Sequence, residues 1–316
     1  MDLTYWHKQT MDAPLFPDLQ WSRPEHKKHA GKLLIIGGNL HGFAAPAEAY
    51  IEANRAGVGL TRVLLPDAVK KIAGNILETV DYAPSTPSGS FSRQALADFI
   101  EQSAWADSVL LVGDFGRNSE TAILLEKFMS KLDLRKIARS QGKSARADSG
   151  LTEGEVALAT SKEGRPLPLE ISWSGDGGAL GKSSKFTGPV VIAKDAADYF
   201  LNTPKSAFER PNTTFVVSMA QLQKIVSGLD LPTPVTFGMD LLKLVDTLHQ
   251  VTKNYPVSIV VKHLNNILVA VGGQVSTTKL ETDLPVWQVK TATHASVWLI
   301  QNPSKAFEAL TTSLLD

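Results

Sequence analysis

Residues 32–42 read Lys32-Leu33-Leu34-Ile35-Ile36-Gly37-Gly38-Asn39-Leu40-His41-Gly42 and introduce a pattern that the rest of the chain repeats. The apolar run predicts a strand at Lys32–Ile36 that is buried on both faces, as in a parallel sheet covered by helices. Two glycines follow it and allow a tight turn. Beyond the turn, Ala45–Ala56 has apolar residues three and four positions apart, which predicts a helix. A strand, a glycine loop and a helix in this order are typical of the α/β class.

The same alternation continues along the chain. Short β-branched or leucine-rich runs predict further strands at Thr61–Leu65, Ser108–Val112, Pro189–Ala193, Thr213–Val217, Ser258–Val261 and Ile267–Val271. Helical periods predict helices at Asp67–Ile76, Ser92–Glu101, Ser119–Leu132, Asp195–Leu201, Ala220–Ser227, Met239–Lys253, Thr293–Gln301 and Ser304–Leu315. We therefore expect one domain over residues 1–316, a three-layer α/β/α sandwich with a mainly parallel sheet.

Composition narrows the classes of function. The chain has 316 residues, with 32 Lys and Arg against 32 Asp and Glu. This balance gives no electrostatic footprint for nucleic acid or an anionic membrane. The absence of Cys excludes disulfides, a thiolate nucleophile and Cys-based metal sites. With no signal-peptide pattern and no stretch of ~18 apolar residues, we expect a cytoplasmic protein that does not enter a membrane.

One segment, at about residues 134–188, breaks the alternation because it is rich in Gly, Ser, Lys and Arg. We expect an irregular insertion there, with at most a short strand at Leu169–Trp173. Within it, residues 176–183 come within one residue of a phosphate-binding P-loop. Asp176 stands where the first glycine belongs, and a further strand follows instead of a helix. We interpret this stretch as a flexible loop.

A second glycine loop, Gly113-Asp114-Phe115-Gly116, follows the strand Ser108–Val112. Because the carboxyl ends of parallel strands meet at one edge of a sheet, both glycine loops are expected to border a shared ligand cleft. The alternative is that the glycines only make tight turns. The candidate residues for binding a substrate are Gly37, Gly38, Asn39, Gly42, Gly113, Asp114 and Gly116.

Several motifs in this order carry a family resemblance: His26-Lys27 before the first strand, Gly37-Gly38-Asn39 after it, Arg55-Ala56-Gly57-Val58-Gly59 after the helix, and residues 113–117. In this the chain resembles the ADP/ATP-dependent NAD(P)H-hydrate dehydratases of the ribokinase-like superfamily. The resemblance implies a ribokinase-like fold and hydrated NADH or NADPH as the substrate. It implies phosphorylation of the ring hydroxyl from ADP or ATP with Mg²⁺, followed by elimination of phosphate. It also implies assembly into a homo-oligomer.

The chain departs from the family where a Gly-Thr-Gly-Asp loop would open a late helix. It reads Lys290-Thr291-Ala292-Thr293-His294-Ala295-Ser296 instead. A gap-free placement puts His294 at the catalytic Asp, so the resemblance implies His294 as the base. The residues implied to hold the nucleotide are Lys262, Thr291, Thr293, Ala295 and Ser296.

Three hypotheses therefore remain open. The chain is an active dehydratase, or an inactive homologue that binds a nucleotide or dinucleotide, or a scaffold subunit. The threonines favour the last two, because their Cβ atoms crowd a conformation built for glycine. No site with protein ligands to a metal is expected, because His26 and His29 have no carboxylate at helical spacing.

Overall fold

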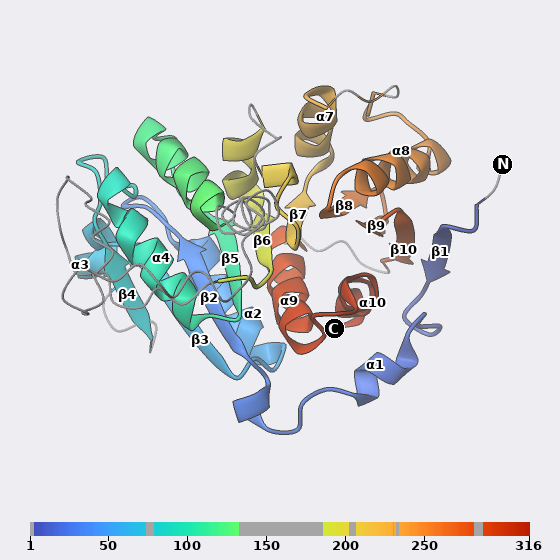
Figure 1. Ribbon diagram of the computed structural model, residues 1–316, viewed down its shortest axis with the longest axis horizontal. Helices are drawn as coiled ribbons and strands as arrows, with labels where there is room; N and C mark the ends of the chain where they lie inside the picture. Colours follow the sequence, from blue (N-terminus) through green and yellow to red (C-terminus); the bar gives the residue numbers. More distant parts are fainter. Residues whose placement is uncertain are drawn as a thin grey trace, which may run out of the picture.

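The computed structural model in Figure 1 describes residues 3–73, 79–132, 186–201, 207–229, 231, 234–280 and 287–316. Its centre is a ten-stranded sheet with the order β1-β10-β9-β8-β7-β6-β5-β2-β3-β4. The strands are β1 Trp6–Gln9, β2 Lys32–Gly37, β3 Leu60–Pro66, β4 Val80–Ala83, β5 Ser108–Gly113, β6 Val190–Ala193, β7 Thr213–Val217, β8 Val257–His263, β9 Asn266–Val271 and β10 Gln274–Lys279.

The sheet is mainly parallel. All neighbours from β4 through β3, β2, β5, β6 and β7 to β8 run in the same direction. Strand β9 is antiparallel to both β8 and β10, and β1 pairs with β10 in parallel. The α/β class predicted from the alternation of strands and helices is therefore confirmed.

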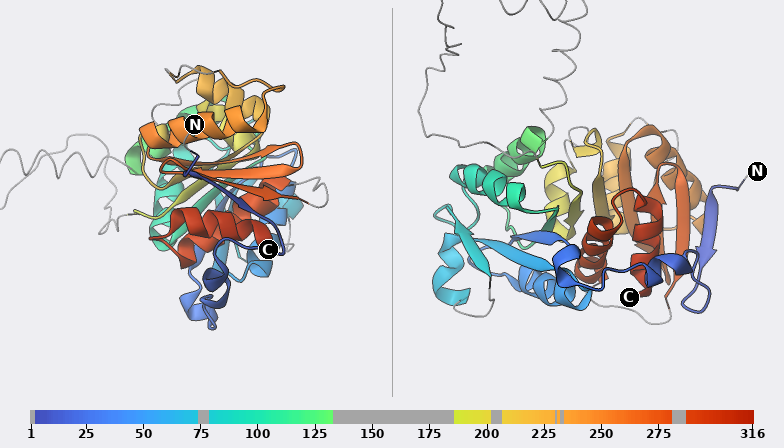
Figure 2. Two further views of the ribbon diagram at one scale, coloured as in Figure 1. Left: turned by 90° about the vertical axis from the view of Figure 1, so that its right-hand side faces the viewer. Right: turned by 60° about the horizontal axis from the view of Figure 1, so that its bottom comes forward.

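Helices cover both faces of the sheet, so the molecule has three layers (Figure 2). One face carries α1 Pro17–Trp21, α2 Ala44–Arg55, α3 Lys70–Ala73, α9 Trp287–Gln301 and α10 Ala306–Thr312. The other carries α4 Leu96–Trp105, a helix over residues 119–132, the 3₁₀ helix η4 Lys194–Phe200, α7 Met219–Ser227 and α8 Leu241–Asn254. Alternate residues of β2 serve the two cores: Leu33 and Ile35 face α2, whereas Leu34 and Ile36 face the α4 layer.

Seven strands were expected, and each was found within two residues of its predicted ends. Strands β1, β4 and β10 were missed because they are short or polar; buried β10 includes Ser276, Thr277 and Thr278. The helix predicted at Thr293–Gln301 begins earlier in the structure, at Trp287. Most of the insertion at about 134–188, with its strand at 169–173 and its motif at 176–183, lies outside the described residues.

The chain reverses its winding between β2 and β5. From β2 it passes through α2 to β3 and on to β4, and then returns to β5 on the other side of β2. The connection after β2 lies on one face, and the helix after β5 lies on the other. Open α/β sheets bind ligands at such a switch point, outside the carboxyl ends of the strands.

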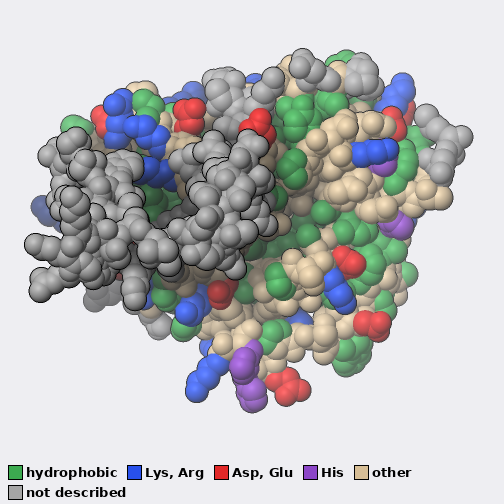
Figure 3. Space-filling model, in the orientation of Figure 1, with side chains coloured by type: hydrophobic (Ala, Val, Ile, Leu, Met, Phe, Trp, Pro, Cys, Tyr) green, Lys and Arg blue, Asp and Glu red, His purple; other side chains and the backbone are tan. Residues whose placement is uncertain are grey.

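Two observations concern the charged surface and the apolar character of the helices. On the face shown in Figure 3, the described basic and acidic side chains are interspersed, in agreement with the zero net charge. Within the described part of the chain, no helix combines the length and the apolar character needed to cross a membrane.

Candidate functional site

The two glycine loops meet at the switch point. The amide of Gly38 donates to the carbonyl of Gly113 over 2.9 Å. A Cβ atom on Gly37 would overlap that same carbonyl oxygen, so the close approach of the two loops requires glycine there. Gly38, Gly113 and Gly116 have φ values of +89°, +110° and +72°, which glycine adopts readily. The sequence prediction that these loops lie together is thus confirmed by the geometry.

Asp114 joins three elements at this edge. One carboxylate oxygen accepts the amide of Ala45 over 2.7 Å and so caps the first turn of α2. The other lies 2.5 Å from the ammonium of Lys194. The side chain of Asn39 donates to the carbonyl of Asp114 over 2.5 Å. Asp114 itself has φ +58°, a left-handed conformation that Asp tolerates better than most residues.

The loop after β6 supplies the remaining support. Asp195 accepts the amides of Asp114 over 2.7 Å and Phe115 over 3.1 Å. Tyr199 donates its hydroxyl to the carbonyl of Gly116. On α7, Gln221 donates to the carbonyl of Lys194 over 2.7 Å and to Asp198 over 2.8 Å.

Of the residues in this support, Lys194, Asp195, Tyr199 and Gln221 were absent from the predicted site. The signal for Lys194 was available in the sequence, because it directly follows the predicted strand Pro189–Ala193 at the carboxyl edge. Tyr199 and Gln221 lie within helices and carry no local motif, so only the tertiary structure brings them to the edge.

An open cleft of about 1100 Å³ lies beside these loops. The residues that line it are Asn39, Asp114, Gly116, Arg117, Asn118, Asp195, Asp198, Tyr199, Leu201, Lys224, Ser227 and Gly228. Of the predicted substrate residues, Asn39, Asp114 and Gly116 therefore border the cleft. Gly37, Gly38, Gly42 and Gly113 are not among its lining residues. Gly37, Gly38 and Gly113 instead make the backbone contacts that hold the two loops together.

Three ionisable groups near the cleft have raised pKa values. Burial raises the pKa of Asp195, although the hydrogen bond from the Asp114 amide offsets part of the rise. Burial also raises the pKa of Glu48 on α2, and the negative charge of Glu52 adds to this effect. The pKa of the Tyr199 hydroxyl is raised by burial as well. Perturbed groups gathered at one cleft are a feature of functional sites.

The residues predicted to replace the Gly-Thr-Gly-Asp loop lie elsewhere. The expectation that Thr291–Ser296 form a turn at a helix start is wrong, because they belong to the interior of α9. Thr293 and Ser296 donate their hydroxyls to the carbonyls of Val289 and Ala292, each over 2.8 Å. Ala295 is fully buried. Backbone amides at these positions serve the helix itself and are not free for a phosphate.

His294 is also separated from the glycine loops. Its side chain is buried between α9 and α2, and its Nε2 atom lies 3.1 Å from a carboxylate oxygen of Glu52. The first turn of α9 instead brings Gln288 to the carboxyl edge, where its amide donates to the carbonyl of Val216 over 3.3 Å. Lys262 lies near the end of β8, with β7 and β6 between it and β5, and it does not line the cleft.

Asp114 and Asp195 offer no free carboxylate oxygen to Mg²⁺. Both oxygens of Asp114 are engaged, one of them by the ammonium of Lys194, and both oxygens of Asp195 accept backbone amides. Mg²⁺ is usually held by one or two carboxylates together with substrate phosphates and waters. Among the described residues, no group of three or more His, Asp or Glu side chains is arranged to hold a metal ion.

Comparison with known proteins gives a partial match in sequence. No family model matches the chain. Over 115 residues it is 27% identical to the bifunctional NAD(P)H-hydrate repair enzyme Nnr of Dictyoglomus turgidum. This match covers 35% of the chain and 22% of that relative, so the chain matches only about a fifth of the relative's length.

Solved structures share the fold. A ribokinase-like superfamily protein from Enterococcus faecalis V583 superposes with a TM-score of 0.62 at 12% identity, covering 100% of this chain and 87% of that one. The ADP/ATP-dependent NAD(P)H-hydrate dehydratase from Bacillus subtilis, co-crystallized with ATP and Mg²⁺, gives 0.52 at 11% identity, covering 95% and 86%. The chain therefore has the ribokinase-like fold, and its resemblance to the NAD(P)H-hydrate repair enzymes is confirmed.

Proposed function

We propose that the chain binds a nicotinamide dinucleotide, as NADH, NADPH or the hydrated form, in the cleft at the switch point, and that it does so without phosphoryl transfer. The observation that carries the proposal is the pair of glycine loops that meet between β2 and β5 and border a cleft of about 1100 Å³. This is the place where open α/β sheets take their ligands. The match to an enzyme named for NAD(P)H-hydrate repair supports this choice of ligand.

The cleft offers charge for a pyrophosphate. Arg117 follows the second glycine loop, Lys224 lies on α7, and both side chains are exposed where they line the cleft. Arg can bind a phosphate with two parallel hydrogen bonds, and Lys acts as a point charge. The ring of Tyr199 provides an uncharged surface for the rest of the ligand, whereas the amides of Asn39 and Asn118 are engaged by Asp114 and Ser88.

The chemistry at the cleft favours binding over turnover. The carboxylates that line its described part, Asp114, Asp195 and Asp198, each accept hydrogen bonds from neighbouring groups. At the first turn of α9 stands the amide of Gln288, which cannot accept a proton at neutral pH. Phosphoryl transfer depends on positioned charge and a group that orients the nucleophile. The described residues supply no such combination with Mg²⁺.

The proposal is tested by calorimetric titration with NADH, NADPH, hydrated NADH, ADP and ATP. We expect the dinucleotides to bind and to raise the melting temperature, because they bind only the folded state. Replacing Arg117 and Lys224 together by Ala should weaken their binding at least ~10-fold, equivalent to ~1.4 kcal/mol. Lys71→Ala is the matched control, since this exposed lysine lies on α3 outside the cleft.

Two results would contradict the proposal. Absence of binding at millimolar dinucleotide would leave the scaffold hypothesis. Conversion of hydrated NADH to NADH in the presence of ADP or ATP and Mg²⁺ would show that the chain is an active dehydratase. In that case the substitution of Arg117 and Lys224 should lower the rate of conversion, whereas Lys71→Ala should leave it unchanged.

A further inference from the structure

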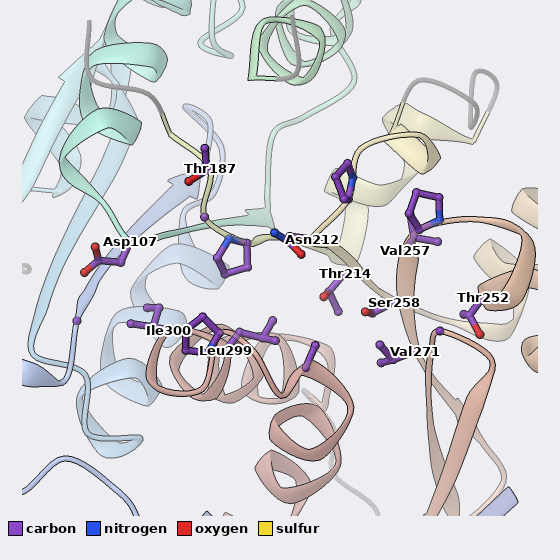
Figure 4. A pocket seen from close by; sticks show the side chains of 18 of the residues that line it. Asp107, Thr187, Asn212, Thr214, Thr252, Val257, Ser258, Val271, Leu299 and Ile300 are labelled. Carbon is purple, nitrogen blue, oxygen red and sulfur yellow. The ribbon is translucent and has the colours of Figure 1, made fainter. Parts of the chain in front are cut away.

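A second cavity lies at the opposite, amino edge of the sheet, where β6, β7 and β8 begin. Its volume is about 620 Å³, within the range of small-molecule sites. Its walls come from the strand starts, from the last turn of α9 and from the connection to α10. Figure 4 shows Leu299 and Ile300 on α9, with Ile300 on the side of Asp107, and Thr214 and Ser258 on the sheet to their right. None of the residues predicted as a site lines this cavity.

Strand register shows why the sheet face is unusual here. One row across neighbouring strands is formed by Val191, Thr214, Ser258 and Val271. The row two residues nearer the carboxyl edge is Ala193, Val216, Val260 and Val269, all buried in the core beneath α9. Two hydroxyls thus replace apolar side chains at the point where α9 ends and no longer covers the sheet.

Both residues are largely buried, and their hydroxyls reach the cavity. Thr214 is 2% exposed and Ser258 is 8% exposed. Neither side chain forms a hydrogen bond with the described protein, although both line the cavity. By contrast, the hydroxyl of Thr252 nearby donates to the carbonyl of Leu248 over 2.9 Å. Because both hydroxyls face the cavity without a partner in the described protein, a molecule in the cavity can form hydrogen bonds with the two together.

The lining also restricts the charge of that ligand. No Lys or Arg is among the lining residues, and Asp107 contributes a carboxylate at the rim. The last turn of α9 borders the cavity, and the carboxyl end of a helix disfavours anions. The other walls combine four prolines at positions 189, 211, 256 and 303, Val257 and Leu299 with the polar residues His29, Thr187, Asn212 and Thr252.

We propose that this cavity is a second binding site, for a non-anionic and mainly apolar small molecule whose hydrogen-bonding group, such as a carboxamide, pairs with the hydroxyls of Thr214 and Ser258. A carboxamide offers one acceptor and two donors, which suits two hydroxyls that can each donate and accept. The site is independent of the proposed dinucleotide cleft, because it lies at the other edge of the sheet.

Benzamide is the probe, with benzoate and benzamidinium as its anionic and cationic counterparts of similar shape. Their dissociation constants are measured by ligand-observed NMR for the full chain and its variants. The test variant combines Thr214→Val and Ser258→Ala, which remove the hydroxyls with little change of volume. Thr61→Val is the matched control, because Thr61 on β3 also has a buried hydroxyl with no partner in the described protein, away from the cavity.

We expect benzamide and benzamidinium to bind at least ~10-fold more tightly than benzoate, and benzamide to bind at least ~10-fold more weakly to the double variant. Thr61→Val and the pair Arg117→Ala and Lys224→Ala should leave benzamide affinity unchanged. All variants should melt close to or above the wild-type melting temperature, which would show that they fold.

The proposal is overturned if benzamide shows no binding at concentrations up to 20 mM. A dissociation constant of that size corresponds to about 2 kcal/mol of binding free energy. Equal affinity for the wild type and the double variant would also overturn it. So would tighter binding of benzoate than of benzamide, or loss of benzamide binding on substitution of Arg117 and Lys224, which would place the probe in the other cleft.

Discussion

Helix α2 contributes to two clusters of ionisable groups, one around Glu48 near the cleft and one around Glu52 a helical turn later. The two clusters differ in whether their carboxylates have charged partners. Towards the cleft, burial and the charge of Glu52 raise the pKa of Glu48. One turn later, Glu52 itself is also penalised by burial, but hydrogen bonds from His294 and Arg55 hold its pKa below the ordinary value. Raised pKa values are common where ligands bind, whereas well-paired charges are common in structural contacts.

The second cluster joins α2, α9 and the residue Asp316. His294 lies between two carboxylates, with Nε2 3.1 Å from Glu52 and Nδ1 3.8 Å from Asp316. Asp316 also accepts the indole N–H of Trp298 over 2.7 Å and lies 3.1 Å from Arg23. This comparison assigns His294 to the contact between two helices, and it leaves the ligand chemistry to the glycine loops.

The largest effect is expected from Gly37→Val. Its Cβ atom would overlap the carbonyl oxygen of Gly113, which is backbone and can move only if the two loops separate. We expect a loss of ~3–5 kcal/mol in unfolding free energy, together with loss of dinucleotide binding. Urea unfolding measures the first and calorimetry the second.

Gly42→Ala is the control for Gly37→Val, because a Cβ atom at Gly42 meets nothing within 4 Å. Its unfolding free energy should stay within ~0.5 kcal/mol of wild type. Equal destabilisation by both substitutions would show that the contact between the loops does not organise the cleft.

His294→Leu should give the next largest effect. It removes one of the two hydrogen-bond partners of buried Glu52, leaving Arg55, and should lower the unfolding free energy by ~1–3 kcal/mol. Dinucleotide affinity should not change, because His294 does not line the cleft. Affinity is measured by calorimetry below the melting temperature of the variant. A specific loss of dinucleotide binding with normal stability would return His294 to the functional site.

Asp114→Ala tests the capping of α2 at the cleft. The substitution removes the acceptor of the Ala45 amide and the partner of Lys194, so we expect a loss of ~1–2 kcal/mol. Asp114→Asn keeps an acceptor and a residue that tolerates φ +58°, and it should cost less than half as much. Thermal unfolding measures both variants, and equal destabilisation of the two would show that the Asp114 carboxylate does not stabilise α2 as a cap.

The smallest effect concerns pH. The pKa values of Glu52 and Asp316 are lowered on folding from ordinary values of 4.5 and 3.8, despite burial, by the bonds from His294 and their other partners. Their contribution to stability is therefore present above those ordinary values and is lost as the pH falls through the lower folded-state values. Glu48 and Asp195 have raised pKa values and act in the opposite direction.

Urea unfolding between pH 7 and pH 3 tests this difference. Glu52→Gln should flatten the loss of stability at acid pH, because it removes a carboxyl with a lowered pKa. Glu48→Gln should steepen that loss, because the group it removes offsets part of it. Identical slopes for the wild type and both variants would show that the two clusters do not differ in the proposed way.

Much of the fold could be predicted because apolar runs reveal buried strands directly. Strand β7 was predicted at its observed ends, whereas polar β10 was missed, since burial of its hydroxyls depends on distant partners. The glycine loops were predicted from Gly37 and Gly113 because they follow strands. His294 was misplaced because a gap-free alignment cannot show that α9 already includes Trp287.

Strand β1 has a consequence for the making of the protein. It pairs in parallel with β10, and Gln9 donates its side chain to Thr278, 269 positions further along the chain. At a synthesis rate of roughly 5–20 residues per second, β10 leaves the ribosome on the order of 15–50 s after β1. During that interval the backbone of β1 has no strand to pair with, so the outermost edge of the sheet is completed only after nearly the whole chain has been translated.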